Sequence, residues 1–181
     1  MTVDHILRTE RLVLRPVTVH DHTALLAHWT DPVVRRFLFD DEVLPPDEVL
    51  AVIAESESTF ADGGYGIWAV QAAGELAAGE QAAGELAAGE LAGTAGLRPL
   101  EDLGIELVYS LSPPAWRKGY ATEAAGAVLD YAFGPLGLPE VLAEIDQGNA
   151  ASVAVIERLG MVPYDLVPGV LGPMTRYRKV R

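Results

Sequence analysis

The sequence predicts an α/β protein of the α+β type, in which a mixed central sheet of about six to seven strands carries helices on both faces. The order of elements favours this three-layer architecture: a strand, two helices, three strands, and then helix, strand, helix and two closing strands. The length agrees with it, because 181 residues, half of them apolar, are enough for one domain with one core. We therefore expect residues 1–181 to form a single domain.

The first third of the chain predicts a strand followed by two helices. RLVLRPV at 11–17 alternates apolar and polar residues, as a half-buried strand does. HDHTALLAHWTDP predicts a short amphipathic helix that ends near Pro32. A longer helix is expected from Pro46 to about Ala61, because it starts with proline, has acids in its first turn and is followed by glycines.

The rest of the chain predicts six strands and two helices. The strand, helix and strand in its middle should form a right-handed crossover that makes the two strands parallel neighbours. The last helix is bracketed by Asn149, a good N-cap residue, and Gly160, a good C′ residue. The strands are predicted at 65–71, 91–99, 104–112, 140–146, 161–167 and 174–180, and the helices from near Gly119 and over 149–159.

A low-complexity segment, AAGELAAGEQAAGELAAGEL at 72–91, separates the second and third predicted strands. It consists of four tandem copies of a five-residue unit. A period of five keeps no single face apolar, at either helical or strand spacing. A loop extension is therefore the simpler interpretation, and an element for partner binding or oligomer assembly is the alternative.

Composition restricts the possible partners. The formal net charge is −13, and no Lys or Arg occurs between Phe37 and Leu97. Such a surface repels nucleic acid and anionic membranes and attracts cations, although acids that only maintain solubility explain it equally well. The absence of Cys excludes disulfides and thiolate nucleophiles. Without a spanning apolar run or a signal peptide, we expect a cytoplasmic bacterial protein, as a monomer or homodimer.

The stretch SPPAWRKGYATEAAGAVLDYAF (112–133) has the features of an anion-binding helix start. Two prolines end the preceding strand, and the first turn of the next helix carries unpaired amides with partial positive charge. Gly119 lets a ligand approach the backbone, and Arg117 and Lys118 add positive charge. A diphosphate fits this geometry, and a turn with solvated basic residues is the alternative. Neither a P-loop nor a dinucleotide-binding glycine pattern is present.

YSLSPPAWRKGYATEA resembles the acyl-CoA-binding strand, turn and helix of the GNAT N-acetyltransferase superfamily, whose pattern is Q/R-x-x-G-x-G/A. Gly119 and Ala121 match this pattern. Trp116 stands where Gln or Arg is usual, and Arg117 where glycine is frequent. TERLVLRPVTVHD, GYATEA and GNAASVAVIERLGM resemble the branch of ribosomal-protein-alanine (RimJ/RimL-like) acetyltransferases. The resemblance covers nearly the whole chain except the repeat.

The resemblance implies a fold with a splayed central strand pair and acetyl-CoA as the co-substrate, with no metal. In the family, the pantetheine arm pairs with the open backbone of the central strand, and the diphosphate lies on the following turn. Asn149 would hold the strand-to-helix crossing beside the pantetheine, or act only as a cap. The residues implied for coenzyme A binding are Tyr109, Ser110, Leu111, Trp116, Arg117, Lys118, Gly119, Tyr120, Ala121, Thr122, Asn149 and Ser152.

Direct attack of an amine on the thioester requires a base and groups that polarise the carbonyl, but no covalent intermediate. Glu106 is the candidate base, since a carboxylate on a covered strand is unusual; the alternative is a buried partner for an arginine or a backbone amide. Ser152 is the second catalytic candidate, because the resemblance implies that it lies close to the thioester sulfur; the alternative is an ordinary serine in the first turn of the helix. Ile156 occupies the position of the family's general-acid tyrosine, so that role is unassigned, with Tyr164 as a guess.

The four histidines all lie within the first 28 residues, and we expect surface or capping roles for them rather than metal binding, with a contact to the substrate as the alternative. Glu123, in the first turn of the helix, is expected to be structural. The acids before and within the second helix should wall the acceptor side and attract a cationic amine, such as a peptide N-terminus or a small amine. The sequence thus predicts an acyl-CoA-dependent N-acyltransferase; the alternative is a domain that senses acyl-CoA without transferring the acyl group.

Overall fold

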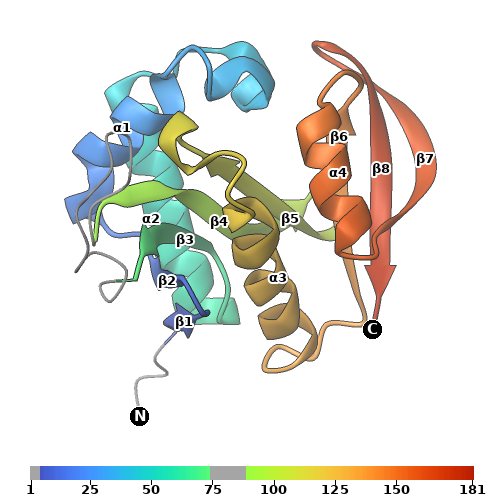
Figure 1. The fold of residues 1–181 in the computed structure, drawn as a ribbon, viewed down its shortest axis with the longest axis horizontal. Helices are drawn as coiled ribbons and strands as arrows, with labels where there is room; N and C mark the ends of the chain where they lie inside the picture. The colour runs from blue at the N-terminus through green and yellow to red at the C-terminus, as the bar shows by residue number, and fades with distance from the viewer. Residues whose placement is uncertain (1–4, 74–88) are drawn as a thin grey trace.

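The computed structural model describes residues 5–73 and 89–181, which form an eight-stranded mixed sheet with helices on both faces (Figure 1). The predicted fold class is confirmed. The strand beyond the expected count is β1, which has two residues and is too short to show a periodicity. The strands are β1 (Leu7–Arg8), β2 (Leu12–Pro16), β3 (Ile67–Ala72), β4 (Leu91–Leu100), β5 (Gly104–Leu111), β6 (Glu140–Asp146), β7 (Val162–Gly169) and β8 (Gly172–Val180).

The strands lie in the order β1-β2-β3-β4-β5-β6-β8-β7. Neighbouring strands from β1 to β5 are antiparallel, and so are the pairs β6–β8 and β7–β8. Within the described residues, β5 and β6 are the one parallel pair, as the predicted crossover requires. The repeat leaves β3 after Ala72 and returns at Leu91, and its residues 74–88 lie outside the part of the chain that the structure describes.

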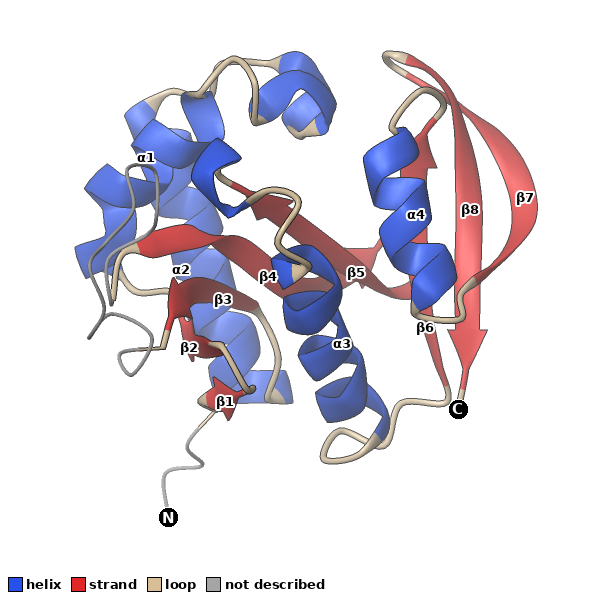
Figure 2. Cartoon of the chain, viewed as in Figure 1, coloured by secondary structure: helices blue, strands red, loops and turns tan. Residues whose placement is uncertain are grey.

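Four α-helices cover the sheet: α1 (His22–Thr30), α2 (Pro46–Gly63), α3 (Tyr120–Phe133) and α4 (Ala150–Arg158). Helices α1 and α2 lie on one face, and α3 and α4 lie on the other, α3 crossing in front of β4 and β5 (Figure 2). One apolar cluster joins α3 and α4 to the strands, and a smaller one joins α1 and α2. Alanines at 124, 125 and 132 are fully buried, and their small side chains let α3 approach the sheet closely.

The predicted helix ends are confirmed by their capping geometry. Helix α2 extends to Gly63, two residues beyond the expected end at Ala61. Gly64 follows it in the left-handed conformation, with a φ of 74°. The side chain of Asn149 accepts a hydrogen bond from the amide of Ser152 at 3.2 Å, as an N-cap does. Gly160, after α4, also has a positive φ of 77°.

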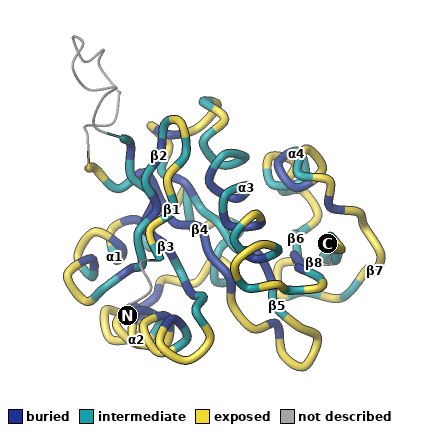
Figure 3. Tube along the Cα trace, turned by 90° about the horizontal axis from the view of Figure 1, so that it is seen from below, coloured by how far each residue is buried: buried dark blue, intermediate teal, exposed yellow. Residues whose placement is uncertain are grey.

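Burial follows the layered arrangement (Figure 3). The buried residues gather along the central strands and the inward sides of the helices, while the outer turns are exposed. Among the described residues, no helix is both long and apolar enough to cross a membrane.

Candidate active site

The two parallel strands at the centre of the sheet diverge. β5 pairs with β4 over its whole length, from Gly104 to Leu111, but with β6 through a single register pair, Glu106 opposite Leu142. The amide of Ser112 donates to the carbonyl of Ala92 at 2.8 Å, which fixes the alternation of the β4–β5 ladder. Leu107, Tyr109 and Leu111 therefore direct their backbone groups toward β6, where the strands separate. This edge is the splayed strand pair that the sequence predicts.

Of the three residues predicted to hold pantetheine, Tyr109 and Leu111 present their backbone at this edge, whereas the backbone of Ser110 faces β4. The indole Nε1 of Trp116 donates to the carbonyl of Leu111 at 2.6 Å. Trp116 therefore fastens the turn after β5 to the strand, and this contact gives tryptophan a structural role at that position. This contact could not be predicted from the sequence, because no local pattern pairs a side chain with the backbone carbonyl of a residue five positions earlier.

The turn that precedes α3 has the geometry of an anion cradle. Arg117 and Gly119 both have positive φ, 60° and 80°. The first backbone bond of α3 runs from the amide of Glu123 to the carbonyl of Gly119 at 3.0 Å, so the amides of residues 120–122 precede the helical ladder. The left-handed conformation at Arg117 explains why glycine is frequent at this position in the resembling family.

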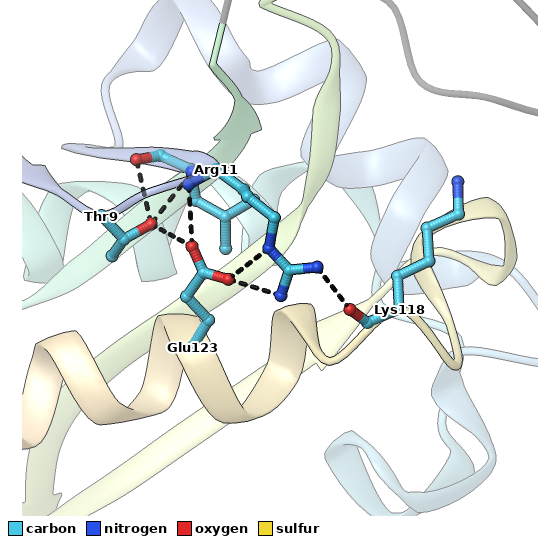
Figure 4. A network of polar contacts seen from close by, with 5 residues as sticks. Thr9, Arg11, Lys118 and Glu123 are labelled. Atoms are coloured by element: carbon cyan, nitrogen blue, oxygen red, sulfur yellow. Dashed lines mark hydrogen bonds and ion pairs between the residues drawn. The ribbon is translucent and has the colours of Figure 1, made fainter. Parts of the chain in front are cut away.

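A network of polar contacts anchors this turn to the N-terminal strands (Figure 4). The carboxylate of Glu123 accepts hydrogen bonds from Thr9 Oγ1 (2.5 Å) and from the backbone amide (2.9 Å) and Nε (2.7 Å) of Arg11. Arg11 Nη1 then donates to the carbonyl of Lys118 at 2.8 Å. Burial alone would raise the pKa of Glu123, but the hydrogen bonds from Thr9 and Arg11 outweigh it and lower the pKa. Glu123 thus has the structural contacts that were expected of it.

A cavity of about 840 Å³ lies on the α1–α2 face of the central strands. Its walls are the 37–40 loop and α2 on one side, and the end of β6 and the β7–β8 turn on the other, with β4 and β5 as the floor. Tyr109, Asn149 and Ser152 also line it, so the cavity reaches the open edge between β5 and β6. Among the described lining residues, Arg98 is the single basic one, against six acids: Asp40, Glu55, Glu101, Glu106, Glu144 and Asp146.

Glu106 lies on the cavity floor and is only 3% exposed. Nε of Arg98, on the neighbouring strand, donates to Glu106 Oε1 at 2.6 Å. Burial raises the pKa of Glu106 above its ordinary value, and Arg98 opposes this shift only in part. Glu106 is therefore a buried partner of an arginine, as one of the two expectations had it, and it lies inside the cavity with a raised pKa; its role as the base stays a prediction.

Comparison with known proteins agrees with this geometry. The family model described as "Acetyltransferase (GNAT) domain" matches residues 11–162, which is most of the chain. The chain belongs to the GNAT acetyltransferase family. Its type is N-acetyltransferase, and the family takes the acetyl group from acetyl-CoA.

Similar proteins span most of the chain. The N-acetyltransferase YoaA of Bacillus subtilis is 26% identical over 157 residues, covering 86% of this chain and 81% of YoaA. An acetyltransferase structure from Agrobacterium tumefaciens has 27% identity and a TM-score of 0.78, covering 97% of this chain and 94% of its own. A structure of RimL, a ribosomal L7/L12 alpha-N-protein acetyltransferase in complex with coenzyme A, has a TM-score of 0.74 over 97% of both chains. At 14% identity, RimL shows likeness of fold alone.

Tyr109 is a candidate for the group that would protonate the leaving thiolate of a GNAT enzyme. The sequence alone did not suggest it for that role. Ile156 is fully buried in the core and Tyr164 is not among the described residues that line the cavity. The hydroxyl of Tyr109 donates to the carbonyl of Ser152 at 3.1 Å, at the junction of β5 and α4. Burial raises the pKa of Tyr109 to about 12, so the hydroxyl keeps its proton at neutral pH.

Two acids at the end of β6 also escaped the sequence analysis. Arg176 Nε donates to Glu144 Oε1 at 2.6 Å, but Oδ1 of Asp146 is buried without a hydrogen-bond partner in the described part of the chain. Burial, followed by the nearby charges of Asp40 and Glu144, raises the pKa of Asp146. They face the distant 37–40 loop across the cavity, an arrangement that no local pattern reveals.

The four histidines have different surroundings. His5 is half-buried, and its Nδ1 lies 2.8 Å from the hydroxyl of Tyr131. His20 is exposed, and the ring of His22 contacts the carbonyl of Pro46 at 2.9 Å, in keeping with surface or capping roles. For His28 the expectation was wrong: it is 5% exposed and packed on α1 between two serines of the β5 segment. Over residues 5–73 and 89–181, no three His, Cys, Asp or Glu side chains come together as a metal site.

Proposed function

We propose that this GNAT enzyme transfers an acetyl group from acetyl-CoA to a primary amine of a cationic acceptor, by direct attack of the amine on the thioester. The observation that carries the proposal is the open backbone edge of β5, because it joins the anion cradle before α3 to an acid-lined cavity. The acceptor is a small cationic amine or the N-terminus of a peptide or protein. We expect a monomer or homodimer.

The geometry supports a binding mode for the diphosphate and the pantetheine arm of coenzyme A. The amides of residues 120–122 and the charges of Arg117 and Lys118 would hold the diphosphate, with Thr122 in the same first turn. The backbone of Tyr109 and Leu111 would pair with the pantetheine amides, like an added strand. The sulfur would then lie near Ser152, whose amide is fixed by Asn149. Acetyl-CoA supplies the activated acetyl group, and the protein supplies position and proton transfer.

The charges of the cavity support a cationic acceptor. Six acids line it against Arg98, and the buried Oδ1 of Asp146 has no partner among the described residues. The raised pKa of Asp146 reflects first its burial and then the neighbouring acids Asp40 and Glu144. A bound ammonium group would offset this repulsion, so the site favours acceptors with a positive charge besides the reacting amine.

Glu106 is the proposed base for the incoming ammonium, acting through water. An ammonium group must lose one proton before its nitrogen can attack, and the raised pKa of Glu106 improves the match between the two groups. Tyr109 is the proposed donor of the proton that the leaving thiolate takes up, because its hydroxyl is protonated at neutral pH and lies at the carbonyl of Ser152. Ser152 would contact the sulfur.

The proposal is tested by measuring release of free thiol from acetyl-CoA with a panel of mono-, di- and polyamines and short peptides, at low and high salt. We expect thiol release to require an amine, and kcat/KM to be highest for multiply charged acceptors and to fall with salt. Binding of acetyl-CoA without thiol release for any amine would instead establish the sensor function. Turnover that is insensitive to acceptor charge and to salt would exclude the cationic preference while leaving the transfer reaction intact.

A further inference from the structure

A buried histidine next to the reaction centre has no role in the mechanism above. His28, on α1, is 5% exposed, and both of its ring nitrogens have a hydroxyl partner. Nε2 lies 2.9 Å from Ser110 Oγ, and Nδ1 lies 2.9 Å from Ser112 Oγ. The imidazole therefore bridges two serines that are two residues apart along the central strand and its continuation.

The contacts continue on the cavity side of Ser110. Its hydroxyl lies 3.0 Å from Thr94 Oγ1, which in turn accepts a hydrogen bond from the indole Nε1 of Trp29 at 3.4 Å. One assignment of hydrogens satisfies every contact: Thr94 donates to Ser110, Ser110 donates to His28 Nε2, and His28 Nδ1 donates to Ser112. The indole of Trp29 can only donate, so Thr94 Oγ1 accepts from it and keeps its own proton for Ser110 in this assignment, which runs from the cavity toward Ser112.

The two ends of this chain have different surroundings. Thr94 and Ser110 line the cavity, whereas Ser112 is half-buried and not among the described lining residues. Ser110 stands between Tyr109 and Leu111, whose backbones form the open edge. Its hydroxyl is on the cavity face of the strand, at the level where the thioester would lie.

Glu106 is poorly placed to take a proton directly from a nitrogen beside Ser110, where the thioester would lie. It precedes Ser110 by four residues, which is about 13 Å along an extended strand. Its Oε1 is also held by Arg98 at 2.6 Å. The amine loses two protons in the complete reaction, one before attack and one after it. Glu106 can take the first in the cavity, but the second must leave from the reaction centre itself.

We propose that Ser110, His28 and Ser112 form a proton relay that removes the second proton from the acceptor nitrogen during acetyl transfer. The proposal rests on the transfer activity proposed above. Burial lowers the pKa of His28 to about 4, so the ring is neutral and passes a proton through rather than storing it. Asp31, the charged group that acts on the ring, raises the pKa less than burial lowers it.

The atoms balance in this step. The amine lone pair forms the N–C bond, the tetrahedral adduct collapses, and the C–S bond breaks with its electron pair on sulfur. The nitrogen proton passes to Ser110 Oγ as the Ser110 proton passes to Nε2, the Nδ1 proton passes to Ser112, and the Ser112 proton passes to water. Tyr109 protonates the thiolate and is reprotonated from solvent. The products are the N-acetylated amine and free coenzyme A.

The test is single-turnover thiol release from the full-length protein with acetyl-CoA and the best amine of the panel. His28→Gln and Ser110→Ala should lower the transfer rate by about 10²-fold, without changing the KM for the amine or the affinity for coenzyme A. Ser110→Thr, which keeps the hydroxyl, should restore most of the rate. His20→Gln is the matched control, since His20 is exposed, and it should behave as wild type.

A proton inventory in mixtures of H₂O and D₂O separates a relay from a structural role. The wild type should give a curved inventory, because several protons move together, and Ser110→Ala should give a linear one. A linear inventory for the wild type, or equal rates for wild type, His28→Gln and Ser110→Ala, would overturn the relay alone. If the wild type releases no thiol with any amine while it still binds acetyl-CoA, the transfer function itself is wrong, and the relay with it.

Discussion

Replacing Glu123 by Gln tests whether the cradle is held in place by the N-terminal strands. The carboxylate accepts from Thr9 Oγ1 and the Arg11 amide at Oε1, and from Nε and Nη2 of Arg11 at Oε2 (2.7 and 2.6 Å). A glutamine can keep the first pair of contacts, but its amide NH₂ would face the guanidinium donors. Two charge-assisted bonds are then lost, nominally about 1.5–3 kcal/mol each. Because the Arg11 side chain is 36% exposed and water replaces part of the loss, we expect a total near 2 kcal/mol.

The loss should depend on pH in a defined direction. The pKa of Glu123 is lowered in the folded protein, so its contribution to stability is present above the unfolded pKa and disappears as the pH falls through the folded value. Urea unfolding at neutral pH should show the full difference between wild type and Glu123→Gln, and the difference should shrink below the ordinary carboxyl pKa. Coenzyme A affinity should fall too, since Arg11 also holds the Lys118 carbonyl.

Glu57→Gln is the control, because Glu57 is exposed on α2. The free energy of unfolding of this variant should differ from that of the wild type by less than about 0.5 kcal/mol. Two results would contradict the reasoning. One is a Glu123→Gln protein as stable as this control. The other is a difference that stays constant into strong acid, which would mean that the carboxylate charge is not what stabilises the contact.

Three further predictions concern the site itself. Arg117→Gly should raise the free energy of unfolding in urea by up to about 1 kcal/mol, because it relieves a positive φ at some entropic cost. It should also weaken coenzyme A binding at low salt, and an unchanged affinity would exclude Arg117 from the diphosphate site. Tyr109→Phe should slow thiol release by about 10²-fold and leave coenzyme A binding intact, since only its backbone holds pantetheine; an unaffected rate would remove it as the acid. Asp146→Asn should raise the KM of diamines more than that of monoamines; an equal effect on both would dismiss the distal ammonium contact.

The elements of this fold were predictable because each has a local signal. Pro46 at the start of α2, Gly64 at its end and Asn149 before α4 satisfy backbone groups within a few residues of themselves. The cradle was predictable for the same reason: Gly119 and the first turn of α3 lie together in sequence. By contrast, β1 was missed because two residues carry no periodicity.

The parts of the site that escaped prediction are contacts between distant segments. His28 meets Ser110 and Ser112 across more than eighty residues, with separations of 82 and 84. Asp146 shares the cavity with Asp40, which lies in a run of three non-glycine residues with positive φ, Phe39 to Asp41. Local composition gives no warning of either, because both follow from the order of strands and from a strained turn.

The same distances explain how one short strand can serve both halves of the reaction. Successive side chains of β5 point to opposite faces, so Tyr109 reaches α4 and Ser152 on one side, while Ser110 reaches α1 and His28 on the other. Between them, the backbone of Tyr109 and Leu111 is directed sideways to the gap left by β6. A thioester bound along that gap would have its sulfur near a protonated tyrosine and its carbonyl carbon near the serine. In the proposed mechanism, the strand itself would keep the proton donor and the proton acceptor apart, and the chemistry would then depend on the divergence of β5 from β6.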